Sequence, residues 1–239
     1  MSGRFDGQVA LVAGGTGGLG RAVSLAFLKE NAKVIAASRR PEQLDALKSA
    51  AGANSAQLDS AVVDVTDEAA VRQLVEKILA QHGRLDILVN TVGGYAGGTK
   101  LWELETKVFD QMLAQNLRSG YALSRAAVRT MLKKGRGAIV NVAAKAAFDH
   151  AAGAAAYAAS KSAAVALLDS LAADLKGSGV RANTILPGII DTPVNRKAMP
   201  TADFSKWPKP EDIARVVLFL CSDDAKVIHG AAIPVYGDS

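Results

Sequence analysis

Seven short apolar runs, separated by stretches long enough for a helix or a loop, divide this chain. Nearly continuous apolar strands that alternate with helices are typical of parallel strands buried on both faces of a sheet. The apolar runs are 8–13, 33–37, 61–63, 86–89, 138–142, 180–186 and 231–235. We therefore predict an α/β fold: a single doubly wound, Rossmann-type domain over residues 1–239, with a seven-stranded parallel sheet and helices on both faces.

The stretches between these runs predict six main helices. One follows the first strand and continues to about Asn31, and the others cover 41–51, 67–82, 109–131, 154–175 and 210–221. The segment 191–209 breaks this alternation, because it holds three prolines, Trp207 and scattered charges. Its length favours a functional flap over a simple connection.

A glycine-rich loop lies between the first predicted strand and the first predicted helix. Glycine permits a tight turn and a close approach of backbone to phosphate, and the following helix N-terminus offers free N–H groups. The strand–loop–helix context indicates a dinucleotide-binding site. The spacing fits either Gly15-x-Gly17-x-x-Gly20 or Gly14-x-x-x-Gly18-x-Gly20.

The second predicted strand ends without an acidic residue. An acidic side chain at this place would bind the ribose 2′-hydroxyl and repel a 2′-phosphate. Ser38 and Arg39 offer a hydrogen-bond donor and a cation instead, and a guanidinium suits the geometry of a phosphate. The sequence therefore favours NADP(H) over NAD(H) as the cofactor.

Tyr157 and Lys161 lie four residues apart in the alanine-rich predicted helix. Residues at this spacing share a helix face. A nearby ammonium favours the phenolate, so we expect Lys161 to lower the pKa of Tyr157. A tyrosine tuned in this way can deliver or accept a proton while a carbonyl or an imine is reduced.

With these motifs, the whole chain resembles the classical short-chain dehydrogenases/reductases, which implies one doubly wound sheet and, usually, a tetramer. The resemblance implies that Tyr157, Lys161 and Asn116 are catalytic, with Asn116 anchoring a proton-relay water. It also implies a cofactor site that holds the pyrophosphate, the adenine and the nicotinamide ribose and carboxamide. The residues of that site are Gly14, Thr16, Gly18, Leu19, Gly20, Ser38, Arg39, Asp64, Val65, Asn90, Lys161, Pro187 and Thr192.

The chain departs from the family at the catalytic serine. Ala144 stands where that serine is expected, about 13 residues before the tyrosine. An alanine cannot donate a hydrogen bond to a substrate oxygen, and losing one such donor costs about 10²–10³ in rate in comparable sites. Ordinary carbonyl reduction would therefore lack an electrophilic donor.

Within the family, the segments 93–98, 144–149 and 191–207 look like dihydropteridine reductase, which also has alanine in place of the serine. A quinonoid dihydropterin is flat and electron-poor and accepts hydride readily, so it would need less polarisation. Tyr95 could stack on such a ring. The predicted substrate contacts are Tyr95, Ala144, His150 and Trp207.

Composition and residue spacing exclude several other kinds of site and ligand. The single cysteine, Cys221, excludes an intrachain disulfide and follows an apolar run, so we expect a buried thiol. The three histidines lack metal-ligand spacing, and we expect no metal. The net charge of +5 is dispersed, which favours a small anionic ligand over nucleic acid. We expect no membrane partner, a cytoplasmic location and a homo-oligomer, either a tetramer or a dimer.

Three functional hypotheses follow. The first is an NADP(H)-dependent reductase that transfers hydride to a pterin-like or otherwise activated C=N or C=O substrate. The second is a general short-chain carbonyl reductase or alcohol dehydrogenase that tolerates Ala144. The third is a non-catalytic NADP(H)-binding sensor whose catalytic set has decayed.

Overall fold

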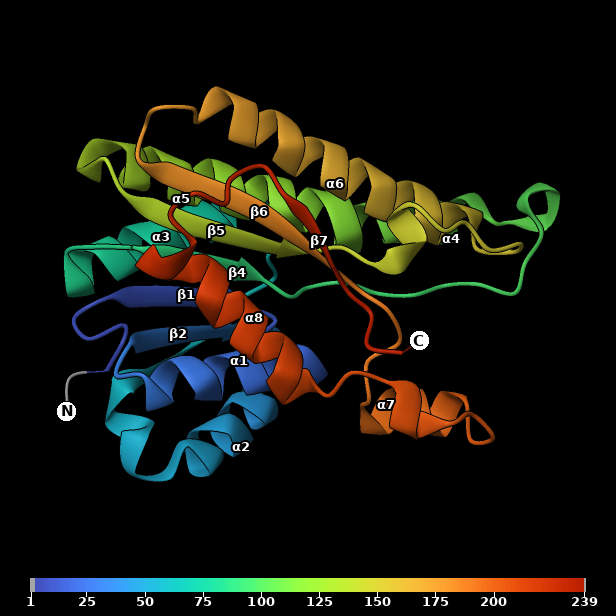
Figure 1. Ribbon diagram of the computed structural model, residues 1–239, viewed down its shortest axis with the longest axis horizontal. Helices are drawn as coiled ribbons and strands as arrows, with labels where there is room; N and C mark the ends of the chain where they lie inside the picture. The colour runs from blue at the N-terminus through green and yellow to red at the C-terminus, as the bar shows by residue number, and fades with distance from the viewer. Residues whose placement is uncertain (1–2, 239) are drawn as a thin grey trace.

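The computed structural model describes residues 3–238 and contains a seven-stranded parallel sheet with the strand order β3-β2-β1-β4-β5-β6-β7 (Figure 1). This confirms the predicted α/β fold class. The strands are β1 Val9–Ala13, β2 Lys33–Ser38, β3 Leu58–Val62, β4 Ile87–Asn90, β5 Gly137–Val142, β6 Val180–Pro187 and β7 Ala232–Val235.

The strand order reverses its direction at β1, which pairs in parallel with both β2 and β4. Ala13, the last residue of β1, lies opposite Ala37 on one side and Asn90 on the other. In doubly wound sheets, ligands bind outside the carboxyl ends of the strands at such a reversal. The topology therefore places the glycine-rich loop at the ligand-binding edge.

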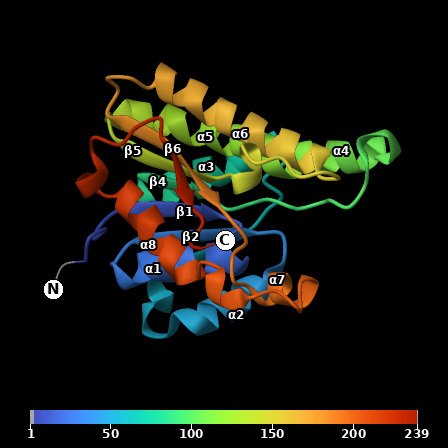
Figure 2. The same cartoon turned by 45° about the vertical axis from the view of Figure 1, so that its right-hand side comes forward.

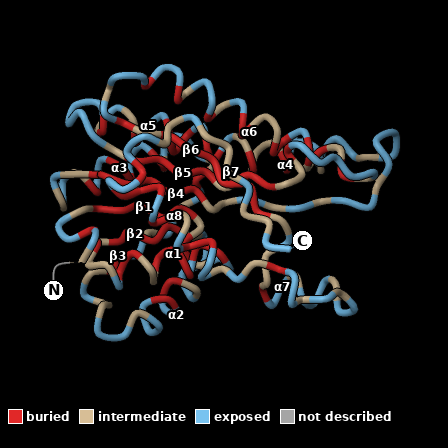
Figure 3. Tube along the Cα trace, viewed as in Figure 1, coloured by how far each residue is buried: buried red, intermediate tan, exposed pale blue. Residues whose placement is uncertain are grey.

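Helices cover both faces of the sheet, and each face has its own buried apolar cluster (Figures 1, 2 and 3). The helices of one face are α1 Gly18–Lys29, α2 Pro41–Ala51 and α8 Pro210–Cys221. The helices of the other face are α3 Glu68–His82, α5 Ser119–Lys134 and α6 Ala155–Asp174. Cys221 is buried at the end of α8, as expected.

The predicted helix over 109–131 is more complex in the structure. It consists of α4 Thr106–Leu113, a π-helical turn at Ala114–Arg118 and α5. A π-turn inserts one extra residue per turn and often occurs at functional sites. Asn116 lies in this turn, and apolar periodicity alone could not reveal the local change of pitch.

Two further strand and helix details have clear physical causes. β3 begins three residues before the predicted apolar run. The prediction missed this part of the strand because Asp59 and Ser60 interrupt the apolar pattern at the edge of the sheet. Asp67 is the N-cap of α3, and its carboxylate accepts hydrogen bonds from the N–H groups of Ala69 and Ala70 at 2.8 and 3.2 Å.

Asp67→Ala should lower the free energy of unfolding by about 1 kcal/mol, because two N–H groups at the start of α3 lose their acceptor. Asp67→Asn, which retains a capping oxygen, is the matched control and should lose less. Chemical denaturation of both variants measures the difference. Equal stability of the wild type and Asp67→Ala would contradict this account of the helix start.

Candidate active site

A groove of about 190 Å³ follows the carboxyl ends of β1, β2, β3 and β4. It combines the glycine-rich loop, the end of β2 and the segment after β4. Its lining residues are Gly14, Thr16, Gly17, Ala37, Ser38, Arg39, Arg40, Gln43, Val63, Asp64, Val65, Thr66, Thr91, Val92, Gly93 and Gln115. Six of the thirteen predicted cofactor residues lie in this lining, namely Gly14, Thr16, Ser38, Arg39, Asp64 and Val65.

Gly14, Gly18 and Gly20 of the loop occupy positions that do not suit a side chain. Gly14 adopts a φ of +72°, which side chains rarely tolerate. A Cβ on Gly20 would lie 2.0 Å from the carbonyl oxygen of Gly14, and one on Gly18 would lie 2.6 Å from Cγ2 of Thr192. The loop therefore forms a cradle that only glycine can build, and its backbone fits a pyrophosphate at the start of α1.

At the end of β2, Ser38 is part of a hydrogen-bond network that the sequence did not reveal. Thr16 Oγ1 lies 2.9 Å from Ser38 Oγ and 2.9 Å from Gln43 Oε1. The backbone N–H of Arg40 donates to Ser38 Oγ at 3.2 Å. Gln43 comes from the first turn of α2, and no motif pointed to it.

Arg39 and Asp64 face one another from the ends of β2 and β3. Arg39 Nη1 lies 3.8 Å from Asp64 Oδ2, and both side chains are about half exposed. Hydrogen bonds from the backbone N–H and the hydroxyl of Thr66 lower the pKa of Asp64, and Arg39 lowers it further. The pair leaves the guanidinium at the groove, where a 2′-phosphate is expected.

Other predicted cofactor residues lie deeper. Leu19 is buried, Val65 is buried although it borders the groove, and Pro187 ends β6. Asn90 is also buried: its Nδ2 donates to Asn141 Oδ1 at 2.8 Å, and its Oδ1 accepts the N–H of Val92 at 3.1 Å. Asn90 therefore ties β4 to β5 and shapes the chain that follows, rather than presenting its amide to the groove.

Tyr157 and Lys161 project from α6 beside the end of β5. Lys161 is buried, and its Nζ donates to the carbonyl of Val142 at 3.1 Å and lies 5.9 Å from the centre of the Tyr157 ring. A Cβ on Gly93 would lie 3.0 Å from Nζ, so glycine at this position leaves room for the ammonium.

The pKa values of this pair differ from our expectation. Burial, with a smaller contribution from Tyr95, raises the pKa of Tyr157 to about 12, while burial lowers the pKa of Lys161 to about 8. The prediction that Lys161 lowers the tyrosine pKa is thus wrong for this structure, because desolvation outweighs an ammonium that is directed to Val142. At neutral pH the phenol keeps its proton and the lysine keeps its charge.

Asn116 clamps the segment that follows β4. Its Oδ1 accepts the N–H of Gly94 at 2.9 Å, and its Nδ2 donates to the carbonyl of Gly94 at 3.1 Å and to Ser160 Oγ at 2.9 Å. Ser160 in turn donates to the carbonyl of Tyr157 at 2.7 Å. The π-turn therefore holds this segment and the tyrosine-bearing turn of α6 in one register.

The clamp places Tyr95 over Tyr157. The two rings meet edge to face with 4.9 Å between their centres, while Tyr95 remains 71% exposed. Ala144 is buried in extended backbone after β5 and presents only a methyl group. Tyr95 and Tyr157 are thus brought together, with no side-chain hydroxyl at position 144.

The segment 191–209 folds on itself at the end of β6. The N–H of Asp191 donates to the carbonyl of Pro208 at 3.0 Å, which closes its base. Thr192 lies against Gly18 and caps α7 Pro193–Ala198. Trp207 is only 7% exposed, and its ring lies 4.9 Å from that of Phe204. The structure therefore assigns Trp207 to packing of the flap, against the prediction of a substrate contact.

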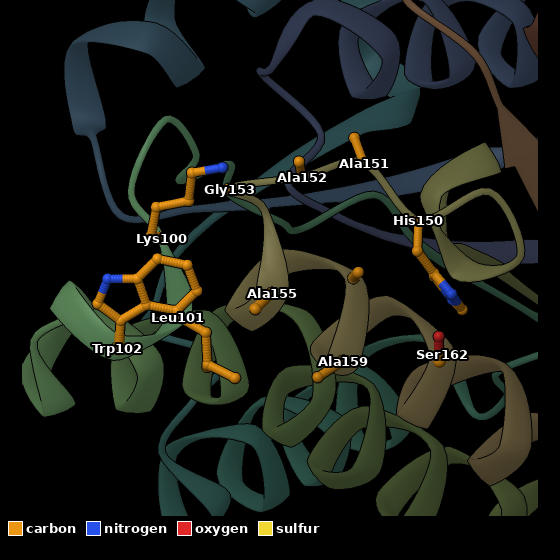
Figure 4. A pocket seen from close by; sticks show the side chains of 11 residues that line it. Lys100, Leu101, Trp102, His150, Ala151, Ala152, Gly153, Ala155, Ala159 and Ser162 are labelled. Carbon is orange, nitrogen blue, oxygen red and sulfur yellow. The ribbon is translucent and has the colours of Figure 1, made fainter.

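His150 also lies apart from the catalytic pair. It lines a separate cavity of about 510 Å³ with Trp102 and one face of α6, whereas Tyr157 and Lys161 do not line it (Figure 4). The His150 ring nitrogen Nε2 lies 3.2 Å from the carbonyl of Ala147. The prediction that His150 lines the substrate pocket is not supported by this arrangement.

The residues 3–238 contain no cluster of three or more potential metal-ligating side chains. No helix in this part of the chain is both long and apolar enough to cross a membrane.

Comparison with known proteins defines the class. Residues 8–203 match the family described as short chain dehydrogenase. The chain is 32% identical to 3-oxoacyl-[acyl-carrier-protein] reductase FabG of Thermotoga maritima over 242 residues, covering 98% of each protein. It is 36% identical to D-threitol dehydrogenase of Mycolicibacterium smegmatis over 243 residues, covering 98% of this chain and 93% of the relative.

Solved structures of known oxidoreductases have the same fold as this chain. ElxO with NADP bound superimposes with a TM-score of 0.91 at 28% identity, covering 96% of this chain and 97% of that one. NAD⁺-bound xylitol dehydrogenase gives a TM-score of 0.90 at 26% identity, covering 98% and 99%. The protein is an NAD(P)-dependent oxidoreductase. It belongs to the short-chain dehydrogenase/reductase family.

Lys161→Met should change stability in a pH-dependent way. The pKa of Lys161 is about 8 in the folded chain against an ordinary 10.5, so the unfolded state binds more protons between these values. Burying the charge therefore costs stability below pH 8, and this cost fades as the pH approaches 10.5. We expect the stability of Lys161→Met relative to the wild type to be greatest near pH 7 and to decline above pH 8.

Urea denaturation of the cofactor-free protein at several pH values measures this difference. The exposed Lys176→Met is the control for loss of a cation in general. A stability difference between Lys161→Met and the wild type that does not vary between pH 7 and pH 10 would show that the buried ammonium carries no such cost.

Proposed function

We propose that this chain is an NADPH-dependent reductase that acts on an activated C=N or C=O group, with a quinonoid dihydropterin as the representative substrate. One observation carries the proposal: Ala144 presents a methyl group beside a complete Tyr157–Lys161–Asn116 set. A substrate that accepts hydride readily does not need the missing hydroxyl, whereas an unactivated ketone does.

Three residues of the chain have distinct roles in the proposed reaction. A bound nicotinamide supplies the hydride. Tyr157 is protonated at neutral pH because burial raises its pKa to about 12, so its hydroxyl can act as the proton donor in the direction of reduction. Lys161 keeps a buried ammonium 5.9 Å from the centre of the Tyr157 ring, and we assign it to holding the nicotinamide ribose, as the family resemblance implies. Asn116 holds the Gly94 segment in place.

Tyr95 would form the second wall of the substrate site. Its exposed ring lies over Tyr157, and a flat heterocycle that displaces or joins this contact would gain an aromatic interaction. The closed segment 191–208 beside the glycine cradle supports its role as a cover for that site.

A specific observation favours the second candidate, a general carbonyl reductase or alcohol dehydrogenase. The relatives described above are a 3-oxoacyl reductase and polyol dehydrogenases, whose names denote carbonyl–alcohol chemistry. The sensor hypothesis has no such support, since Tyr157, Lys161 and Asn116 are all retained and spatially connected. Homo-oligomeric assembly stays a prediction from the family resemblance, and a cytoplasmic location stays a prediction from the sequence.

Ala144→Ser separates the two candidates. Restoring the hydroxyl should raise the rate on a simple aliphatic ketone by about tenfold or more, by analogy with single oxyanion-site donors. It should leave the rate on quinonoid dihydropterin nearly unchanged. NADPH oxidation measures both rates. Turnover of ketones but not of the dihydropterin by the wild type would replace the pterin proposal with the general reductase.

Arg39→Asp should move cofactor preference from NADPH toward NADH. It removes the cation and adds a second carboxylate beside Asp64, which would repel a 2′-phosphate. Loss of a charged contact of this kind is worth about tenfold or more in affinity. Lys29→Asp makes the same charge change at the C-terminal end of α1, the end away from the glycine loop, and is the control. An unchanged ratio of NADPH to NADH dissociation constants in Arg39→Asp would refute the assignment of Arg39.

A further inference from the structure

Three side chains at the end of β2 form a hydrogen-bonded row that ends at the groove. Gln43 Oε1 lies 2.9 Å from Thr16 Oγ1, and Thr16 Oγ1 lies 2.9 Å from Ser38 Oγ. The row is half-buried, so water does not freely replace these contacts. All three residues line the groove together with Arg39.

The number of hydrogens in this row is limited. A threonine hydroxyl carries one hydrogen, so Thr16 can donate to Gln43 or to Ser38 but not to both. If Thr16 donates to the Gln43 carbonyl, Ser38 must donate to Thr16 to complete the row, and Ser38 then has no hydrogen for the groove. If the Gln43 amide is turned over, its NH₂ donates to Thr16, and Thr16 donates to Ser38.

The second direction frees the hydroxyl hydrogen of Ser38. Ser38 Oγ already accepts the N–H of Arg40 at 3.2 Å. With Thr16 as a second donor, its acceptor sites are filled and its own hydrogen is directed elsewhere. The groove is the side on which Arg39 is exposed, and α2 begins there at Pro41 without a side-chain cap. An anionic group placed here would meet the guanidinium, a hydroxyl donor and a helix N-terminus.

We propose that Gln43 is a positioning residue for cofactor selectivity, because its amide sets the direction of the Gln43–Thr16–Ser38 row. A ribose 2′-phosphate, which only accepts hydrogen bonds from this row, selects the direction in which Ser38 donates. A ribose 2′-hydroxyl can donate to Ser38 and is compatible with the opposite direction. The inference rests on the proposed binding of a nicotinamide dinucleotide in this groove.

Gln43→Glu tests the direction of the row. An ionised carboxylate only accepts hydrogen bonds, so Thr16 must donate to it and Ser38 can no longer donate to a 2′-phosphate. The affinity for NADPH relative to NADH should fall by about tenfold or more, the usual worth of a charge-assisted hydrogen bond. Gln43→Met removes the amide that directs Thr16 toward Ser38, so the ratio should also fall, but by less than in Gln43→Glu, because no carboxylate forces the opposite direction.

Gln43→Glu in a Thr16→Val background distinguishes an effect transmitted through the hydrogen-bonded row from direct repulsion of the 2′-phosphate by the new carboxylate. Without the threonine hydroxyl, Gln43 and Ser38 are disconnected, so Gln43→Glu should change the NADPH-to-NADH ratio much less than in the wild-type background. Titration of NADPH and NADH fluorescence gives all dissociation constants. The cycle measures a coupling between positions 16 and 43 that a merely structural role would not produce.

An unchanged ratio in Gln43→Glu, or an equal loss in both backgrounds, would overturn the inference while leaving the wild-type preference for NADPH intact. Failure of the proposed cofactor preference takes a different form, namely a wild type that binds NADH at least as tightly as NADPH. The change in ratio on Gln43→Glu still decides the inference in that case. A wild type that binds neither dinucleotide would overturn both.

Discussion

The contact between the Gly14 carbonyl and the α-carbon of Gly20 sets the geometry on which the rest of the site depends. A Cβ on Gly20 would collide with the Gly14 carbonyl oxygen. Because glycine has no Cβ, β1 can turn directly into α1 at the point where the strand order reverses. The turn brings the start of α1 against Thr192 of the flap and places Thr16 beside Ser38. One backbone constraint thus organises the phosphate cradle, the cofactor-selective end of β2 and the base of the flap.

Burial is the second constraint, and it acts on the proton-transfer groups in opposite directions. Desolvation raises the pKa of Tyr157 to about 12 and lowers that of Lys161 to about 8. Both effects disfavour charge, which fits a site that must hold a neutral phenol until the substrate takes its proton. The Asn116 clamp and the Tyr95 ring complete this enclosure. In the proposed function, Ala144 limits the chemistry to substrates that need no further polarisation.

Much of this architecture could be predicted from the sequence. The apolar runs predicted the seven strands, because parallel strands buried on both faces are nearly continuously apolar. Asp67 as an N-cap follows from the chemistry of its carboxylate beside a helix start. The glycine loop was also predictable, since its role needs only a strand before it and a helix after it. Tyr157 and Lys161 were found through helical spacing, a property of one element.

The remaining features depend on contacts between elements or on small changes of pitch. Gln43 joins the site through a hydrogen bond to Thr16, 27 residues earlier in the chain. The π-turn at Asn116 leaves apolar periodicity almost unchanged. Trp207 and His150 were misplaced because sequence proximity to the flap or to Tyr157 does not determine which face of an element they occupy. The tyrosine pKa was misjudged because burial cannot be weighed from residue spacing.

The central claim is that this oxidoreductase uses Tyr157 as its acid in a site without a hydroxyl at Ala144. The most direct measurement is the rate of NADPH oxidation with quinonoid dihydropterin for the wild type and Tyr157→Phe, with NADPH binding measured in parallel. Loss of a positioned general acid predicts a fall of about 10²-fold or more in kcat, with NADPH affinity retained. Full activity of Tyr157→Phe, or no turnover by the wild type, would contradict the account.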